Sequence, residues 1–182
     1  MNPLEINGWT IYAHPLFLEQ VDALTRKVNR LQEKDPLGYR SKPATKRLAA
    51  IVKLAKHDIP QDPAGSQYRQ GNTLGTEHTH WCRAKFYQQY RLFFRYDLAS
   101  KILIYAWVND ESTKRAYDSK QDAYAVFRKM LKNGNPPDSW NDLWRAAISD
   151  GERIKTLLGA EDDQDARQTS YFKCEEGKRE GR

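Results

Sequence analysis

The stretch WCRAKFYQQYRLFFRY, residues 81–96, predicts two β-strands joined by a short turn. Alternate residues of a strand face opposite sides of a sheet, and the length of the turn decides which residues of the two strands share a face. A two-residue turn at 88–89 would mix apolar and charged side chains on both faces. A three-residue turn at 88–90 separates them, with the cross-strand pairs Phe86–Leu92, Ala84–Phe94 and Cys82–Tyr96. We therefore predict the second register.

In this register one face of the strand pair carries mainly cations. Its members are Arg83, Lys85, Tyr87, Arg91, Phe93 and Arg95, and the segment contains no carboxylate that would neutralise them. The pattern fits a solvated strand face that pairs with acids elsewhere in the chain. It also fits a cradle for phosphate groups, with Tyr87 or Phe93 stacking on a base. RNA is favoured over duplex DNA because no predicted helix carries a basic, base-reading face.

The segments before this strand pair predict a helical hairpin. Residues 9–12 indicate a short strand. Apolar residues then recur at intervals of four and three through residues 17–31, which predicts a helix that begins at Pro15. Pro43 starts a second predicted helix and Pro60 ends it. The apolar stripes of two such helices must pack against another layer, so an α+β fold is expected.

The segments after the strand pair predict a further strand and a helix. Residues 102–108 are a short apolar run typical of a buried strand, and a polar loop follows it. Arg115 and Tyr117 in that loop either take part in function or cap the next helix. An apolar stripe in residues 123–131 indicates that helix.

Charge is unevenly distributed along the 182 residues. Residues 1–145 carry 23 Lys and Arg against 15 Asp and Glu, whereas residues 146–182 carry 7 against 9. A basic body predicts a polyanionic partner, which on composition alone is RNA, DNA or an acidic protein. We expect residues 1–145 to form one domain. Residues 146–182 are expected to be a polar, acidic tail, partly helical at first and then disordered.

Several classes of protein and site are not expected. The apolar run at 102–108 is too short to span a bilayer, and the N-terminus lacks the pattern of a secretory signal. Cys82 and Cys174 lie far apart, which indicates neither a disulfide framework nor a zinc site and favours a reduced, cytoplasmic setting. His78 and His80 lack a third ligand, so no metal is expected there, although either could assist acid–base chemistry.

Several short stretches resemble the YhaV family of toxins, and they occur in the same order as in that family. They are residues 7–9 (NGW), 12–15 (YAHP), 44–46 (ATK), 90–96 (YRLFFRY), 107–111 (WVNDE), 122–124 (DAY) and 129–132 (KMLK). The resemblance covers residues 7–145. More generally, the helical hairpin, the glycine-bearing loop and the Arg-x-Lys and Tyr-Arg motifs are similar to RelE-like toxins.

The resemblance implies both a fold and an activity. The fold is RelE-like, or microbial-ribonuclease-like, with the helical hairpin packed on a small antiparallel sheet of about four strands, plus a C-terminal helix. The activity is that of a type II toxin–antitoxin component, an endoribonuclease that cleaves mRNA, free or on the ribosome, and halts growth. The implied partners are mRNA and a PrlF-like, swapped-hairpin antitoxin, with operator DNA contacted only through the toxin–antitoxin complex.

The resemblance also implies site residues. Those with catalytic roles are Arg83, Lys85, Arg91, Arg115 and Tyr117, with Lys114 or Tyr124 as alternatives to the last two. Those expected to bind RNA are Arg95, Tyr87, Phe93, Lys114, Lys120 and Tyr124. From the residue types we expect metal-independent cleavage, in which the ribose 2′-OH attacks the adjacent phosphorus and Arg83 and Arg91 stabilise the developing charge. Lys85 is the candidate general base, and Tyr117 or Tyr124 the proton donor.

Two rival functions use the same cationic face. One is a non-catalytic module that binds RNA or the ribosome, which needs no general base or proton donor. The other is a DNA-binding autoregulator that acts with its antitoxin. Salt-sensitive, sequence-specific binding of duplex DNA by the free chain would favour the latter.

Overall fold

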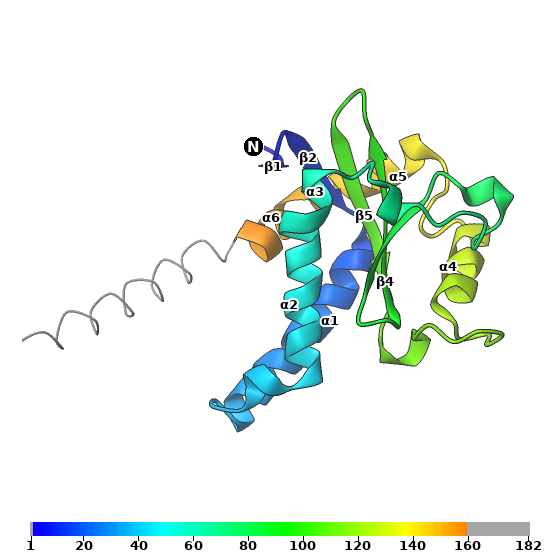
Figure 1. Cartoon of the computed structure of the whole chain (residues 1–182). Coiled ribbons are helices and arrows are strands. Elements are labelled where there is room, and N and C mark those ends of the chain that lie inside the picture. The colour runs from blue at the N-terminus through cyan, green and yellow to red at the C-terminus, as the bar shows by residue number, and fades with distance from the viewer. Residues whose placement is uncertain (1, 160–182) are drawn as a thin grey trace, which may run out of the picture.

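The fold is built on one five-stranded sheet, with strand order β1-β2-β5-β4-β3 (Figure 1). The computed structural model describes residues 2–159. The strands are β1 (Leu4–Ile6), β2 (Trp9–Ala13), β3 (Cys82–Phe86), β4 (Tyr90–Asp97) and β5 (Ile102–Val108). Neighbouring strands are antiparallel except β2 and β5, which pair in parallel. The α+β class is therefore confirmed, but the four-stranded, wholly antiparallel sheet was wrong.

The parallel pair has a topological reason. After β2 the chain passes through the helical hairpin and a long loop before it returns as β3, β4 and β5. Strand β5 runs antiparallel to β4 and in the same direction as β2, with Ile11 opposite Leu103. Two parallel strands need such a long connection between them, and no local sequence pattern predicts that they pair.

The helical hairpin follows the sequence pattern closely. Helix α1 (Pro15–Lys34) begins at Pro15, and the His14 side chain caps it by accepting a hydrogen bond from the Leu16 N–H at 3.2 Å. Helix α2 (Pro43–Lys53) continues through a wider π-type turn (Leu54–Asp58) into the short α3 (Ile59–Gln61), so the helical run ends one residue beyond Pro60. Within the described residues, short 3-10 helices lie at Tyr39–Ser41, Ser66–Tyr68, Thr76–His78 and Glu111–Thr113.

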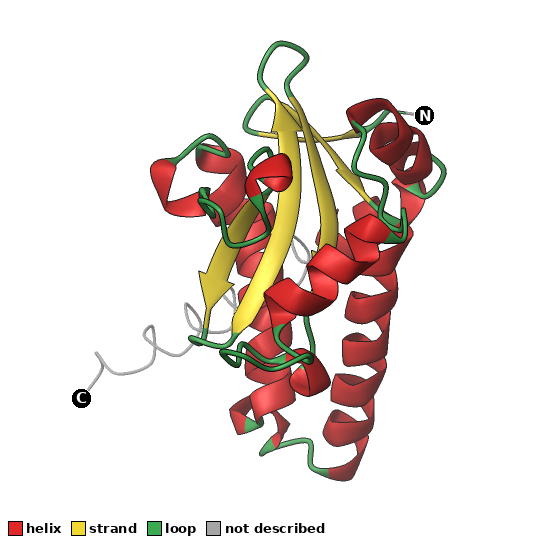
Figure 2. Ribbon diagram, turned by 90° about the vertical axis from the view of Figure 1, so that its right-hand side faces the viewer, coloured by secondary structure: helices red, strands yellow, loops and turns green. Residues whose placement is uncertain are grey.

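Helices cover both faces of the sheet (Figure 2). On the first, the α1–α2 face, the buried residues include Phe17, Val21, Ile51, Leu92, Phe94 and Tyr105. On the second, the α4 face, they include Trp81, Phe93, Trp107, Phe127 and Leu143. Helices α4 (Ala123–Lys132) and α5 (Trp140–Ile148) pack on the second face, whereas α6 (Gly151–Gly159) contributes Ile154 and Leu158 to the first core.

The β3–β4 turn has the predicted length but lies one residue earlier. Residues 87–89 form it, so the pairs are Phe86–Tyr90, Ala84–Leu92 and Cys82–Phe94, two residues away from the predicted register. Tyr87 and Gln88 adopt left-handed backbone conformations, with φ of 43° and 60°. Both registers have the same parity, so the two faces are separated as predicted even though the individual pairs were wrong.

The C-terminal part contains one helix that the sequence analysis missed. Helix α5 begins at Ser139, whose hydroxyl accepts a hydrogen bond from the Asp142 N–H, a capping pattern present in the sequence. No helix within residues 2–159 is long and apolar enough to cross a membrane. The expected disorder of the end of the chain concerns residues 160–182, which lie outside the described residues.

Candidate functional site

Two arginines and one tyrosine meet on the α4 face of the sheet. Arg83 of β3 and Arg91 of β4 both point toward helix α4, and each donates from Nε to the hydroxyl oxygen of Tyr124, at 3.0 Å and 3.2 Å. Tyr124 is itself only 4% exposed. Its position in the first turn of α4 is set by Asp122, whose carboxylate caps the helix by accepting from the Tyr124 and Ala125 N–H groups. We call Arg83, Arg91 and Tyr124 the arginine cluster.

Backbone carbonyl oxygens accept hydrogen bonds from the Nη1 atom of each guanidinium. Arg83 Nη1 donates to the Gln67 carbonyl oxygen at 2.7 Å, and Arg91 Nη1 donates to those of Gln88 and Tyr90 at 2.7 Å and 2.8 Å. Both arginines are largely buried, at 8% and 7% exposed. Because every hydrogen bond is to a neutral oxygen, each guanidinium is fixed in place while its positive charge stays uncompensated.

The cluster keeps donors free for a ligand. Across residues 2–159, neither Arg83 nor Arg91 forms an ion pair with a carboxylate. Their Nη2 atoms make no hydrogen bond, yet within the described residues only Trp144 Nε1 is both buried and without a partner. Both Nη2 atoms therefore reach the surface. Two oriented donors with uncompensated charge make a site for a phosphate group.

Arg115 stands beside the cluster but is neutralised. It forms an ion pair with Asp122, and its guanidinium lies 4.1 Å from the ring centre of Tyr117 and 4.8 Å from that of Tyr124. Burial alone would raise the pKa of Asp122, but hydrogen bonds from Arg115 and the Ala116 N–H hold it below its usual value. Arg115 thus supports the cap of α4, as one of the two interpretations predicted, and its part in function stays a prediction.

Asn109 is a positioning residue that sequence reasoning missed. Its side-chain oxygen accepts from the Arg91 N–H at 2.6 Å, and its Nδ2 donates to the carbonyls of Gln89 and Thr113 at 3.1 Å and 2.8 Å. It therefore ties the β3–β4 turn to the loop after β5. The available signal was its place as the first polar residue after a buried strand, where it is only 2% exposed.

Phe93, Arg95 and Tyr87 do not form the open face that was predicted. Phe93 has no exposed surface and stacks on the rings of Phe127 and Trp107, so the proposed base stacking is corrected to a core role. Arg95 lies between two indoles, 5.5 Å and 5.4 Å from their ring centres, and donates to the Asp138 carbonyl. Tyr87 lies in the turn and is 56% exposed, with its hydroxyl 3.3 Å from the Lys46 carbonyl oxygen of α2. For Phe93 and Arg95 the cause is that α4 and α5 cover the strand face whose exposure was assumed. Tyr87 instead lies beyond the end of β3.

The remaining predicted residues are exposed. Lys85 is exposed and stands opposite Arg91 in the strand register. Lys114 and Lys120 are exposed in the loop before α4, and Tyr117 is 83% exposed. Their roles toward a ligand stay predictions.

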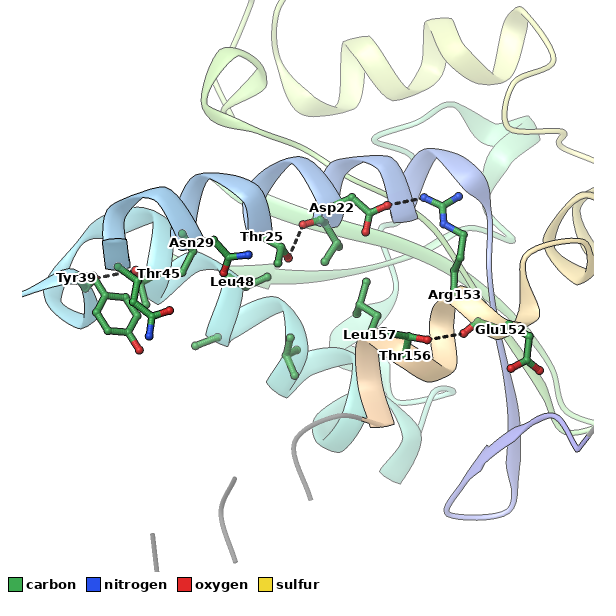
Figure 3. A pocket seen from close by; sticks show the side chains of 15 residues that line it. Asp22, Thr25, Asn29, Tyr39, Thr45, Leu48, Glu152, Arg153, Thr156 and Leu157 are labelled. Atoms are coloured by element: carbon green, nitrogen blue, oxygen red, sulfur yellow. Dashed lines mark hydrogen bonds and ion pairs between the residues drawn. The ribbon is translucent and has the colours of Figure 1, made fainter. Parts of the chain in front are cut away.

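A separate cavity lies on the opposite side of the sheet. It has a volume of about 710 Å³ and is lined by α1, α2 and α6, with Arg153 of α6 paired to Asp22 of α1 at its rim (Figure 3). None of the predicted site residues lines it. The residues predicted from the sequence therefore lie away from this cavity.

Comparison with known proteins identifies the family. Residues 11–148 match the family model of YhaV toxins, described as a toxin with endonuclease activity, of a toxin–antitoxin system. The chain is 47% identical over 145 residues to the ribonuclease toxin YhaV of Escherichia coli K12, covering 79% of this chain and 94% of that protein. It is equally identical, over 143 residues, to toxin YhaV of Escherichia coli O6:H1, covering 78% and 93%. No solved structure matches the chain. This chain belongs to the YhaV toxin family.

Proposed function

We propose that this chain is a ribonuclease toxin that cleaves mRNA at the arginine cluster. The observation that carries the proposal is the pair of guanidinium groups fixed on one tyrosine hydroxyl, without carboxylate partners and with their Nη2 atoms at the surface. The family description and the name of the Escherichia coli relative support a nuclease that acts on RNA. A RelE-like fold is part of the proposal, supported by the helical hairpin on one face and the paired arginines on the other.

The proposed reaction uses the substrate's own nucleophile. The ribose 2′-OH attacks the adjacent phosphorus, a bond from the 2′ oxygen to phosphorus forms, and the bond from phosphorus to the 5′ oxygen breaks. The products are a 2′,3′-cyclic phosphate and a free 5′-OH. Arg83 and Arg91 donate to the phosphoryl oxygens as charge builds, and their fixed geometry avoids reorganisation during the reaction. Because the nucleophile comes from the RNA, this scheme requires no metal-bound water at the cluster.

The surface residues supply proton transfer and RNA contacts. Lys85, exposed beside Arg91, is proposed to take the 2′-OH proton. Tyr117, exposed and stacked on Arg115, is proposed to donate to the leaving 5′ oxygen. Tyr124 holds both arginines and is therefore a positioning residue first. Lys114, Lys120 and Tyr87 are proposed to contact flanking nucleotides.

The decisive experiment reads growth and message integrity together. Expression of the wild-type chain in bacteria is expected to arrest growth and fragment mRNA, whereas the double variant Arg83→Ala/Arg91→Ala is expected to grow with intact message. Arg145→Ala is the matched control, because Arg145 is 78% exposed and pairs only with Asp142 of its own helix. If the wild type leaves growth and mRNA untouched, the non-catalytic binding module becomes the better description.

A purified system separates catalysis from binding. Arg91→Lys keeps the charge but loses the planar fork, so cleavage is expected to slow by about 10²–10³-fold, the usual cost of one lost oxyanion donor. Lys85→Ala is expected to lose cleavage while it keeps RNA affinity, because Lys85 is proposed to move a proton. A Lys85→Ala chain that retains both cleavage and RNA affinity would remove Lys85 from the proposed proton transfer.

The partners beyond RNA follow from the family and are part of the proposal. They are a PrlF-like antitoxin, with operator DNA bound only through the toxin–antitoxin complex, and mRNA that is cleaved free or on the ribosome. Pull-down with the candidate antitoxin and cleavage assays with and without ribosomes test these points directly. We propose a cytoplasmic protein whose ribonuclease domain, expected in residues 1–145, extends through α6, because Ile154 and Leu158 belong to the first core.

A further inference from the structure

Three metal-ligand side chains converge at a second place on the α4 side. His78 and His80 lie in the loop before β3, and Asp138 comes from the segment before α5. His78 Nδ1 and His80 Nε2 lie 3.1 Å and 2.9 Å from Asp138 Oδ1, and the three ligand atoms are all within 4.8 Å of one another. In the sequence only the two histidines lie close enough together to suggest a pair of metal ligands. The fold supplies the third ligand, from a position 58 residues further along than His80.

The spacing suits a tetrahedral transition-metal ion. With metal–ligand bonds of about 2.0–2.1 Å, neighbouring ligand atoms of a tetrahedral zinc site are about 3.3 Å apart. The two observed separations from Asp138 Oδ1, 3.1 Å and 2.9 Å, differ from that value by only a few tenths of an ångström. The two imidazole nitrogens lie within 4.8 Å of each other, so small side-chain movements would bring all three ligand atoms to these separations. The His80 and Asp138 side chains are 36% and 37% exposed, so an ion can reach them from solvent.

Outer hydrogen bonds fix the ligands, as they do in metal sites generally. Trp81 Nε1 donates to Asp138 Oδ1 at 2.7 Å, and the indole is fully buried. Gln70, only 5% exposed, donates to the His78 carbonyl at 2.9 Å and accepts from the Leu74 N–H. Arg95 donates to the Asp138 carbonyl. Both backbone segments that carry the ligands are thus held independently of any ion.

We propose that His78, His80 and Asp138 bind one zinc-class divalent ion, with water in the fourth position. Two imidazoles and one carboxylate suit Zn²⁺ or Ni²⁺ and not Mg²⁺ or Ca²⁺, which prefer all-oxygen sites. The ion joins the loop before β3 to the segment before α5. That loop leads through Trp81 directly into β3, the strand that carries Arg83. It acts on the stability of this region, and the cleavage scheme does not pass through it. The inference is independent of the proposed function.

The competing description is a metal-free arrangement in which Asp138 accepts three hydrogen bonds. Both descriptions predict that the side chains meet, so the test must measure the ion itself. The full-length chain is stripped of metal and titrated with Zn²⁺ by calorimetry, and Co²⁺ is added separately to read the visible absorption of a four-coordinate site. The variants are His80→Ala and Asp138→Asn. His57→Ala is the control, because His57 is exposed on the turn after α2.

We expect the wild-type chain and His57→Ala to bind one Zn²⁺ per chain and to show the four-coordinate Co²⁺ spectrum. Each ligand variant is expected to bind Zn²⁺ at least about tenfold more weakly and to lose that spectrum. Asp138→Asn retains an acceptor for Trp81, so its metal-free melting temperature verifies that it is folded. If wild type and both ligand variants bind Zn²⁺ equally, or if wild type binds none, the metal-free arrangement is correct and the proposal is overturned.

Discussion

The two faces of the β3–β4 strand pair bury side chains in different ways. On the α1–α2 face, Leu92 and Phe94 pack into a hydrophobic core and are fully buried. On the α4 face, Phe93 is just as buried, but its neighbours Arg83 and Arg91 carry their charges into the same layer. One strand pair thus supplies an ordinary core on one side and a charged, hydrogen-bonded site on the other.

The difference teaches how a cationic site can be kept both rigid and charged. A carboxylate beside Arg83 or Arg91 would hold the guanidinium firmly but would also cancel the charge that a phosphate needs. Tyrosine and backbone oxygens hold it without that loss, at a cost in desolvation that the surrounding core must offset. Arg115, paired with Asp122, shows the alternative solution a few ångströms away.

The largest expected effect tests whether the two faces are equally part of the core. Phe93→Ala and Phe94→Ala should each lower the free energy of unfolding by about 3–5 kcal/mol, the usual loss for a buried phenylalanine. Urea unfolding of both variants measures this. Had Phe93 been a base-stacking residue, its variant would lose RNA affinity while keeping wild-type stability, and that result would contradict the structure.

The next effect tests a buried ionisable side chain, His14, which caps α1. Burial lowers the pKa of His14 from 6.5 to about 4. Between these two pH values His14 is therefore neutral in the folded chain but protonated in the unfolded chain. Stability is therefore complete above pH 6.5 and is lost as the pH falls toward 4, by about 3 kcal/mol for this group. His14→Asn keeps a capping side chain without that titration, so its unfolding free energy should fall less between pH 7 and pH 4. Equal pH dependence in the two proteins would show that His14 is not the cause.

A smaller effect isolates the tyrosine that joins the two arginines. Tyr124→Phe removes one hydroxyl that accepts from both Nε groups and leaves the ring packing against Phe93. Cleavage is expected to slow by about tenfold, equivalent to about 1.4 kcal/mol, because the guanidiniums lose part of their fixed geometry. Single-turnover cleavage of a model RNA measures the rate. An unchanged rate would mean that the backbone carbonyls alone position the arginines.

The smallest effect concerns the exposed cations around the site. Lys120→Ala should change the free energy of unfolding by less than about 0.5 kcal/mol, as expected for an exposed side chain. Its RNA affinity should fall modestly and become less dependent on salt, because one phosphate contact is lost. Affinity measured at two salt concentrations tests this. Identical salt dependence in variant and wild type would remove Lys120 from the proposed RNA surface.

Helices and strands were predicted well from the sequence because each depends mainly on the spacing of apolar residues within its own segment. The spacing of apolar residues and Pro15 were sufficient for α1, and strand alternation was sufficient to place Arg83 and Arg91 on one face. The cross-strand register was wrong by two residues because strand parity cannot distinguish registers that differ by an even number. The parallel pairing of β2 with β5 has no local signature at all.

The site was only partly predictable for a related reason. The side chains that complete it come from distant segments: Tyr124 lies 41 positions after Arg83 along the chain, and Asp138 lies 60 after His78. Sequence reasoning named Tyr124 through the family resemblance but could not place it on the arginines. It also treated the cationic face as open, because nothing in residues 81–96 shows that a later helix covers Phe93.

The late arrival of α4 has a consequence for the synthesis of the protein. A nascent chain that has emerged only as far as β4 already carries both arginines, but not the hydroxyl that orients them. The closing partner of β2, strand β5, also emerges some 90 residues after β2 itself. The sheet is therefore completed only once β5 has emerged, and the arginine cluster only once α4 has followed it. The reactive arrangement cannot form while the message upstream of the Tyr124 codon is still being read.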